Sequence, residues 1–356
     1  MHTKLQEILK LAVANKTSDV HLMKGVVPKF RLNGELVNAP NMTQMEDSLI
    51  EEMIESLLDE KKKAELTSLK EIDFSFETDE SRFRANVYYQ QDSLACSLRL
   101  IASRIPSFEE LQLPNILRNF ANLKQGFVLV TGPTGHGKST TVAAILDEIN
   151  KTRNSHIVTI EDPVEYIIKS NKSIISQREL GNDTGDFSRA LRSCLRQDPN
   201  VVFIGEMRDL ESIQSALTIA ETGHLVFSVL HTNSAAQTID RIIDVFPSGA
   251  KEQIKIQLSS VITAVVSQRL VPALGGGMIP ALEILMSNSA VKNIIREGKT
   301  FMIDNIIQTS AEAGMVSLDS YLAKLVLEGK ISQEIAVNFS SNPLDFNNRL
   351  RNKKIL

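Results

Sequence analysis

A glycine-rich run near the middle of the chain has the residue types and spacing of a phosphate-binding loop. It reads GPTGHGKS and matches the pattern G-x-x-x-x-G-K-[ST] at every fixed position. In this pattern, glycines let the backbone N–H groups face phosphates, the lysine reaches the β and γ phosphates, and the final hydroxyl binds Mg²⁺. An apolar stretch, 127–130, precedes the run and a helical pattern, 140–149, follows it, as the motif requires. The sequence therefore predicts that ATP and Mg²⁺ are bound by Gly132, Pro133, Thr134, Gly135, His136, Gly137, Lys138, Ser139 and Thr140.

Two acidic residues stand where strand ends would place them beside this loop. Phosphoryl transfer needs carboxylates near the metal and the attacking water, and these normally follow strands. One apolar stretch runs directly into Glu161, and another runs into Gly205 and Glu206. Glu206 occupies the place of a Walker B acid, which would hold Mg²⁺ together with Ser139. A single carboxylate after a strand is more often an exposed loop residue, but a pair of them beside a phosphate-binding loop favours hydrolysis of the nucleotide.

Two histidines bracket a further apolar stretch, residues 225–230. His224 precedes this stretch and His231 follows it. A histidine so placed could contact the γ phosphate or orient the attacking water. The alternative is a structural hydrogen bond made by a neutral imidazole, and residue type alone favours that alternative.

These candidate residues lie in a stretch with an α/β pattern. From Gly126 onward, short apolar strands alternate with helical segments, which predicts a wound, mostly parallel sheet. Strands are predicted at 127–130, 156–160, 201–204 and 225–230. After a glycine-rich turn at 275–277, helical segments are predicted at 288–297, 301–309, 317–328 and 331–339.

The first hundred residues have the pattern of a smaller α+β domain. Apolar spacing predicts a helix over 3–15, and Asn33 with Gly34 predicts a hairpin turn between 29–32 and 35–37. Residues 43–66 are charged and helical in pattern, and an antiparallel meander follows at 72–76, 83–89 and 94–100. The period of two places Arg84 and Arg99 on the face opposite the apolar side chains, away from this domain's core.

A linker separates the two patterns. Residues 102–114 contain Pro106, Pro114 and several polar residues, but no sustained period. We therefore expect an N-terminal domain at 1–101, a linker at 102–114, and a second domain with C-terminal helices at 115–356.

Composition argues against several classes of protein. A formal net charge of −4 and 42% hydrophobic residues indicate a folded protein without a global attraction to nucleic acid. Cys96 and Cys194 are far apart and can form neither a disulfide framework nor a four-thiolate zinc site. Since neither a long apolar run nor a signal peptide is recognisable, we expect a cytoplasmic protein that binds no nucleic acid and no zinc and reaches a membrane through a partner.

Several segments together resemble those of the secretion and pilus ATPase superfamily, specifically its branch of twitching-motility retraction ATPases. The segments around the candidate site read GPTGHGKSTT at 132–141, VTIEDPVEY at 158–166, LRQDPNVVFIGEMRD at 195–209 and ETGHLVFSVLHTNSA at 221–235. With SDVHL at 18–22 and SFEELQLP at 107–114, the resemblance covers nearly the whole chain.

The resemblance implies a PAS-like N-terminal domain joined to a RecA-like P-loop ATPase domain, with six copies forming a ring. In the family, the glutamate matching Glu161 is the general base, and the one matching Glu206 helps to hold Mg²⁺ through water. His224 and His231 match the His box, which favours functional roles for both. Residues matching Arg84 and Arg99 are brought onto the phosphates when the domains close. ATP hydrolysis would then retract type IV pili at the inner membrane, through a platform protein and with other pilus ATPases as candidate partners.

Sequence features distinguish the retraction branch from its rivals. Assembly and secretion relatives usually carry a longer N-terminal region and a four-cysteine zinc insert, which this chain lacks. Residues 290–297 read AVKNIIRE, similar to the retraction signature AIRNLIRE, but Lys292 replaces an arginine whose planar fork an ammonium does not reproduce. His136 replaces the usual serine or alanine, with little loss expected because the loop binds through its backbone. The alternatives are a conjugation-type secretion ring ATPase and an accessory, largely non-catalytic retraction subunit.

Overall fold

A computed structural model of the protein describes residues 1–32, 34–78, 81–101, 104–207 and 209–352. The chain forms two compact units, Met1–Arg104 and Ile105–Leu356. Of the sequence predictions, the turn residue Asn33 and residues 102–103 of the linker lie outside the described residues.

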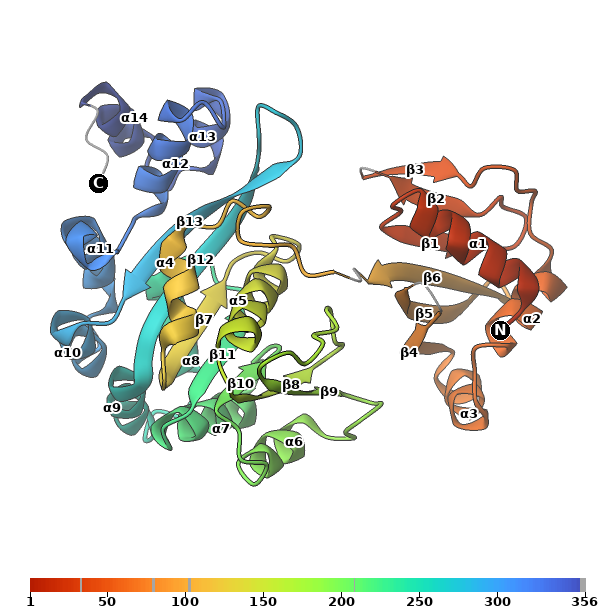
Figure 1. Ribbon diagram of the computed structural model, residues 1–356, viewed down its shortest axis with the longest axis horizontal. Helices are drawn as coiled ribbons and strands as arrows, with labels where there is room; N and C mark the ends of the chain where they lie inside the picture. Colours follow the sequence, from red (N-terminus) through yellow and green to blue (C-terminus); the bar gives the residue numbers. More distant parts are fainter. Residues whose placement is uncertain (33, 79–80, 102–103, 208, 353–356) are drawn as a thin grey trace. The chain divides into compact units, whose positions relative to one another are not determined.

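The N-terminal unit is an antiparallel sheet with helices packed on it (Figure 1). Its six strands have the order β3-β2-β1-β6-β5-β4. The elements are α1 (Thr3–Ala14), β1 (Asp19–Leu22), β2 (Lys29–Leu32), β3 (Glu35–Asn38), α2 (Asp47–Glu55), α3 (Glu60–Leu69), β4 (Glu71–Glu77), β5 (Arg82–Gln90) and β6 (Ser93–Ile101).

Alternation along these strands separates a buried face from an outer one. Val20, Phe83 and Leu98 are fully buried and share one apolar core with side chains of α1 and α2. Arg84 and Arg99 alternate with these residues and are partly exposed and mostly exposed, respectively, as the period of two predicts. Burial of apolar area on one face of the sheet therefore stabilises the unit and leaves the arginines on the other face.

The charged stretch at 43–66, which is helical in pattern, forms two helices. Helix α2 ends at Glu55, and α3 begins after Asp59, whose side chain accepts a hydrogen bond from the N–H of Lys62 at 2.8 Å. A carboxylate at this position satisfies one of the free N–H groups at the start of a helix. The predicted helical character of this stretch is therefore confirmed, with a short break between the two helices.

The C-terminal unit is built on a seven-stranded sheet of order β13-β12-β7-β11-β10-β8-β9. Neighbouring strands are parallel except for β12 with β13, so the predicted mostly parallel sheet is confirmed. The sequence analysis missed the strands β9, β12 and β13. The seven strands are β7 (Gly126–Thr131), β8 (His156–Glu161), β9 (Ile174–Glu179), β10 (Val201–Ile204), β11 (Leu225–Leu230), β12 (Ile262–Pro272) and β13 (Met278–Met286).

Helices cover both faces of this sheet (Figure 1). They are α4 (Asn115–Asn119), α5 (Lys138–Thr152), α6 (Phe187–Cys194), α7 (Leu210–Glu221), α8 (Ala235–Asp244), α9 (Lys251–Val261), α10 (Ser289–Glu297), α11 (Ile303–Thr309), α12 (Leu318–Leu327), α13 (Gln333–Phe339) and α14 (Pro343–Asn352). One buried cluster joins the sheet to α5 and α12, and a second joins its other face to α6 through α11. Consecutive residues of β7, Phe127 and Val128, belong to different clusters, since successive strand side chains point to opposite faces.

The C-terminal helical region matches its sequence pattern closely. Helices α10 to α13 lie at the four predicted segments with small shifts in their ends, and α14 follows them. Among the described residues, we find no helix with both the length and the apolar character that crossing a bilayer demands.

Candidate nucleotide site

The glycine-rich run joins the end of β7 to the start of α5, which is the strand–loop–helix arrangement that a phosphate-binding loop requires. Gly132 has φ 139°, and Gly135 and Gly137 have φ 79° and 74°. A side chain at Gly132 would collide with β12, since an ideal Cβ would lie 2.1 Å from the carbonyl oxygen of Gln268. Glycine therefore allows the loop to curl and to lie directly against this strand.

Hydrogen bonds made by Gln268 and His136 connect the phosphate-binding loop to β12. Gln268 Nε2 donates to the carbonyl oxygen of His136 (2.8 Å), and its Oε1 accepts from Thr141 Oγ1 (2.7 Å). His136 Nδ1 accepts a hydrogen bond from the N–H of Leu270 at 2.9 Å. Burial and two nearby cations lower the pKa of His136, which favours the neutral ring that this bond needs. His136 therefore stabilises the loop through its side chain, a role that the sequence analysis did not foresee.

Gln268 is a site residue that the sequence analysis missed. It is 2% exposed and lies on β12, a strand that was itself not predicted. The signal that could have identified it is a change from a mostly apolar run, VITAVV at 261–266, to the polar residues Ser267, Gln268 and Arg269. A buried amide needs hydrogen-bond partners, and here the loop and the first turn of α5 supply them.

The amine of Lys138 lies inside the loop. Its Nζ donates to the carbonyl oxygen of Pro133 (2.8 Å) and lies 3.4 Å from His231 Nδ1. Lys138 is 5% exposed, and burial lowers its pKa, although Glu206 and Glu165 oppose that shift. A desolvated ammonium beside the N–H groups that begin α5 attracts anions more strongly than one in water.

The order of the strands brings the two candidate carboxylates together. Strands β10 and β8 are parallel neighbours with Ile204 in register with Ile160, so Gly205 and Glu161 follow at the same edge. The N–H of Gly205 donates to the carbonyl oxygen of Ile160 at 2.8 Å. An ideal Cβ at Gly205 would lie only 3.1 Å from Glu161 Cα, so glycine permits this close approach. Glu206, the next residue, consequently begins at the same edge of the sheet as Glu161.

His231 connects the predicted Walker B acid to the loop. It follows β11, which lies between β7 and β10 in the sheet. Its Nε2 lies 3.1 Å from Glu206 Oε1, and its Nδ1 lies 3.2 Å from Thr134 Oγ1. The structure therefore brings His231 together with the loop and with Glu206, and a contact of its ring with the γ phosphate stays a prediction.

Glu161 is a buried carboxyl group, with the residue 6% exposed. Its Oε1 accepts hydrogen bonds from Thr159 Oγ1 (2.7 Å) and Gln177 Nε2 (3.2 Å). Burial raises the pKa of Glu161 to about 7, although these two hydrogen bonds oppose the shift. A pKa near neutrality suits a group that accepts a proton from water, because the base is ionised at working pH and still basic enough to react.

His224 lies at the opposite end of β11 from His231. Its Nδ1 lies 3.0 Å from Thr222 Oγ1 and 3.1 Å from the carbonyl oxygen of Ile219. The two histidines flank a strand of six residues, and seven steps at about 3.3 Å per residue separate them by roughly 23 Å. Within one chain, His224 is therefore not brought to the loop, and a role for it in hydrolysis stays a prediction.

Arg84 and Arg99 lie in the N-terminal unit, directly opposite each other on β5 and β6. Arg99 Nε lies 2.9 Å from Asp19 Oδ1, and Arg84 Nε lies 3.7 Å from Asp73 Oδ1. Their side chains are 69% and 41% exposed, so both can change partner without unpacking a core. Their contact with phosphates stays a prediction.

The donor set fits a nucleoside triphosphate with Mg²⁺. The loop N–H groups and Lys138 suit phosphate oxygens. Ser139, the second residue of α5, and Glu206 offer the oxygen ligands that Mg²⁺ prefers. When bound, Mg²⁺ held by Ser139 and Glu206 would neutralise the charge that develops during transfer. The fold and the site together define a P-loop ATPase.

Comparisons with known proteins place the chain within this class. Residues 1–278 match the family described as type II/IV secretion system protein. The chain is 43% identical over 343 residues to the type IV pilus retractation ATPase PilT of Pseudomonas aeruginosa, which covers 96% of this chain and 99% of that protein. It is 43% identical over 339 residues to a twitching motility protein of Neisseria gonorrhoeae, with 94% and 90% covered. A crystal structure of the pilus retraction motor PilT with bound ADP matches with a TM-score of 0.91 and 42% identity, covering 98% of this chain and 100% of that one.

The chain therefore belongs to the type II/IV secretion system protein family. Its resemblance to the pilus retraction ATPases, predicted from the motifs, is confirmed over nearly the full length of both chains.

Proposed function

We propose that this protein is an ATP-hydrolysing motor that powers retraction of type IV pili. The observation that carries the proposal is the convergence of Lys138, His231, Glu206 and Glu161 at one edge of a parallel sheet. Similarity over 96% of the chain to a protein named as a pilus retractation ATPase supports retraction as the work that hydrolysis drives.

The residues divide the chemistry among themselves. Lys138 and the loop N–H groups bind the β and γ phosphates, and Ser139 and Glu206 are the residues that would hold Mg²⁺. Glu161 accepts the proton of the attacking water, for which its burial and raised pKa suit it. His231 lies 3.1 Å from Glu206, so loss of the γ phosphate can be transmitted to the loop that follows β11.

The family resemblance extends this proposal to the assembly. Six copies form a ring, and Arg84 and Arg99 of the N-terminal domain supply positive charge to the phosphates. Steps of the N-terminal domains against the ATPase domains pull pilin subunits from the pilus base. We further propose a cytoplasmic location at the inner membrane, held there by a platform protein and shared with other pilus ATPases.

Two experiments test the proposal at different levels. Purified Glu206→Gln and Glu161→Gln variants should bind ADP with nearly normal affinity while phosphate release falls at least about 100-fold. Full turnover by either variant would refute the site assignment. A deletion strain should carry many pili without surface movement, whereas bare cells would reassign the protein to pilus assembly.

The same assays distinguish the two rivals. If the protein were an accessory, largely non-catalytic subunit, the purified wild-type protein would itself release no phosphate from ATP. A conjugation-type secretion ATPase would hydrolyse ATP, but its deletion would leave both pili and surface movement unchanged.

A further inference from the structure

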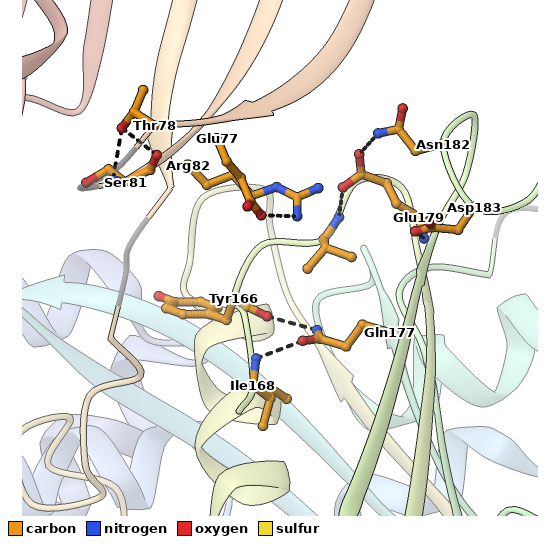
Figure 2. A network of polar contacts seen from close by, with 11 residues as sticks. Glu77, Thr78, Ser81, Arg82, Tyr166, Ile168, Gln177, Glu179, Asn182 and Asp183 are labelled. Atoms are coloured by element: carbon orange, nitrogen blue, oxygen red, sulfur yellow. Dashed lines mark hydrogen bonds and ion pairs between the residues drawn. The ribbon is translucent and has the colours of Figure 1, made fainter. Parts of the chain in front are cut away.

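The side-chain amide of Gln177 occupies the centre of a small network beside the catalytic carboxylate. Gln177 lies on β9, the strand next to β8. Its Nε2 donates to Glu161 Oε1 (3.2 Å) and to the carbonyl oxygen of Tyr166 (2.9 Å), while its Oε1 accepts from the N–H of Ile168 (2.7 Å). Figure 2 shows the amide between Tyr166 and Ile168, pointing from β9 toward the loop that follows β8.

This network uses the full donor capacity of one amide. A glutamine NH₂ group has two hydrogens, and here one goes to the carboxylate and the other to the loop backbone. The oxygen then fixes which way the amide points, because only its carbonyl end can accept from Ile168. Neither a carboxylate nor an apolar side chain of similar size could make this set of three bonds.

The loop held by Gln177 is also tied to the phosphate-binding loop. The hydroxyl of Tyr166 lies 3.0 Å from Thr140 Oγ1, in the first turn of α5. One residue, Tyr166, therefore contacts the helix that begins at the phosphates through its ring and contacts Gln177 through its backbone. A continuous path of hydrogen bonds runs from Thr140 through Tyr166 and Gln177 to Glu161.

We infer that Gln177 is a positioning residue, which fixes the position of the Glu161 carboxylate relative to the bound nucleotide by linking it to the loop that contains Tyr166. This inference rests on the proposed role of Glu161 as general base. Thr159 bonds the same carboxylate oxygen from within β8, so it restrains Glu161 without touching the loop. Of these two side-chain donors, Gln177 alone connects the base to the loop and, through Tyr166, to α5, while the backbone N–H of Glu165 bonds the carboxylate from within the loop itself.

The charges around Glu161 make the amide important. The charge of Glu165 in the same loop raises the pKa of Glu161, although a hydrogen bond from the backbone N–H of Glu165 lowers it. Glu179 is in register with Glu161 on β9, and Glu206 begins at the neighbouring strand end. Gln177 thus places a neutral donor directly beside the base, at an edge of the sheet where other acidic residues begin. A carboxylate in place of the Gln177 amide, which lies 3.2 Å from Glu161 Oε1, would repel Glu161, since like charges oppose each other strongly in a buried site.

The test compares Gln177→Leu, Gln177→Glu and Thr159→Val in the full-length protein. Phosphate release with MgATP gives kcat and KM, a fluorescent ADP analogue gives nucleotide affinity, and thermal unfolding reports the fold. We expect Gln177→Leu to lower kcat at least tenfold while KM and ADP affinity stay within about twofold. Gln177→Glu should lower kcat at least as much, and Thr159→Val should lower it less, because the loop stays attached. Gln253→Leu, on the exposed face of α9, is the matched control and should equal the wild type.

Each outcome decides the inference. A kcat that is unchanged in Gln177→Leu overturns it, as does a parallel loss of kcat, ADP affinity and melting temperature, which would make Gln177 merely structural. Thr159→Val with a larger loss than Gln177→Leu also overturns it. Full turnover by Glu161→Gln would instead show that Glu161 is not the general base, which would refute the proposed function on which the inference rests. The Gln177 variants cannot give this result, because they leave Glu161 itself unchanged.

Discussion

Arg84 and Arg99 face each other in register across β5 and β6, on the outer face of the N-terminal sheet. Like charges in such a cross-strand pair repel each other. Asp19 lies 2.9 Å from Arg99 and Asp73 lies 3.7 Å from Arg84, so each arginine has an acidic neighbour within its own unit. The two ion pairs differ in burial, since the Asp19 side chain is 14% exposed and the Asp73 side chain is 55% exposed.

We expect Asp19→Asn to lower the free energy of unfolding by about 1 kcal/mol, and Asp73→Asn to lower it less. Burial raises the pKa of Asp19, but hydrogen bonds from Arg99 and Ser18 outweigh it, and the net pKa is lowered. A carboxyl group whose pKa is lower in the folded than in the unfolded protein stabilises the fold fully at pH values above its unfolded-state pKa. This stabilisation is lost as pH falls through the folded-state pKa. Urea unfolding at pH 7 and pH 3 should therefore show a deficit for Asp19→Asn that shrinks at pH 3. An equal deficit at both pH values would contradict the ion pair.

A second prediction concerns the contact of the loop with β12. Gly132→Ala should weaken ADP binding at least about 100-fold, because its Cβ would meet the Gln268 carbonyl at 2.1 Å and must push the loop away. Gly135→Ala is the matched control, since no atom lies within 4 Å of its added Cβ and only the positive φ of 79° is strained. That strain costs about 1–2 kcal/mol. Titration with a fluorescent ADP analogue should therefore rank wild type, Gly135→Ala and Gly132→Ala in that order, and equal losses would contradict the close contact.

Much of the site could be predicted because local patterns encode it. The loop residues and the acids after β8 and β10 follow from short motifs and from the rule that parallel strands end at one edge. The hydrogen-bond partners of Gln268 and Gln177 could not be predicted, because they depend on which strands become neighbours across the sheet. His136 illustrates the same limit: its residue type was noted, but its bond to Leu270 exists only because β12 lies beside β7.

A third prediction concerns the pH dependence of turnover. Burial raises the pKa of Glu161 to about 7, so the fraction of ionised base falls as pH decreases through about 7. We expect kcat to drop about tenfold for each pH unit well below this value and to level off above it. Steady-state phosphate release between pH 5.5 and 8.5 measures the profile. A kcat that stays flat down to pH 5.5 would contradict a general base with this pKa.

The last prediction concerns Glu283, a partly buried residue of β13 that stabilises the loop after β11. Its Oε1 accepts a hydrogen bond from the N–H of Ala235, at the start of α8, at 2.8 Å. Burial raises the pKa of Glu283 to about 7, with Asp304 and Asp319 adding to the shift and this hydrogen bond opposing it. The folded-state pKa of Glu283 lies above its unfolded-state pKa. The protonated Glu283 carboxyl group therefore makes its full contribution to the free energy of unfolding at low pH, and this contribution is lost as pH rises through about 7.

Glu283→Gln, which is neutral at every pH, should therefore gain stability relative to the wild type as pH rises from 5 to 8. A shift from the ordinary value of 4.5 to about 7 limits this gain to roughly 3 kcal/mol. Urea unfolding of both proteins at pH 5 and pH 8 measures it. Glu297→Gln is the control, because its carboxylate is exposed beside Lys299, which lowers its pKa, so it should show no such gain. A stability difference between Glu283→Gln and wild type that does not change between the two pH values would show that Glu283 titrates in the folded protein as it does in water.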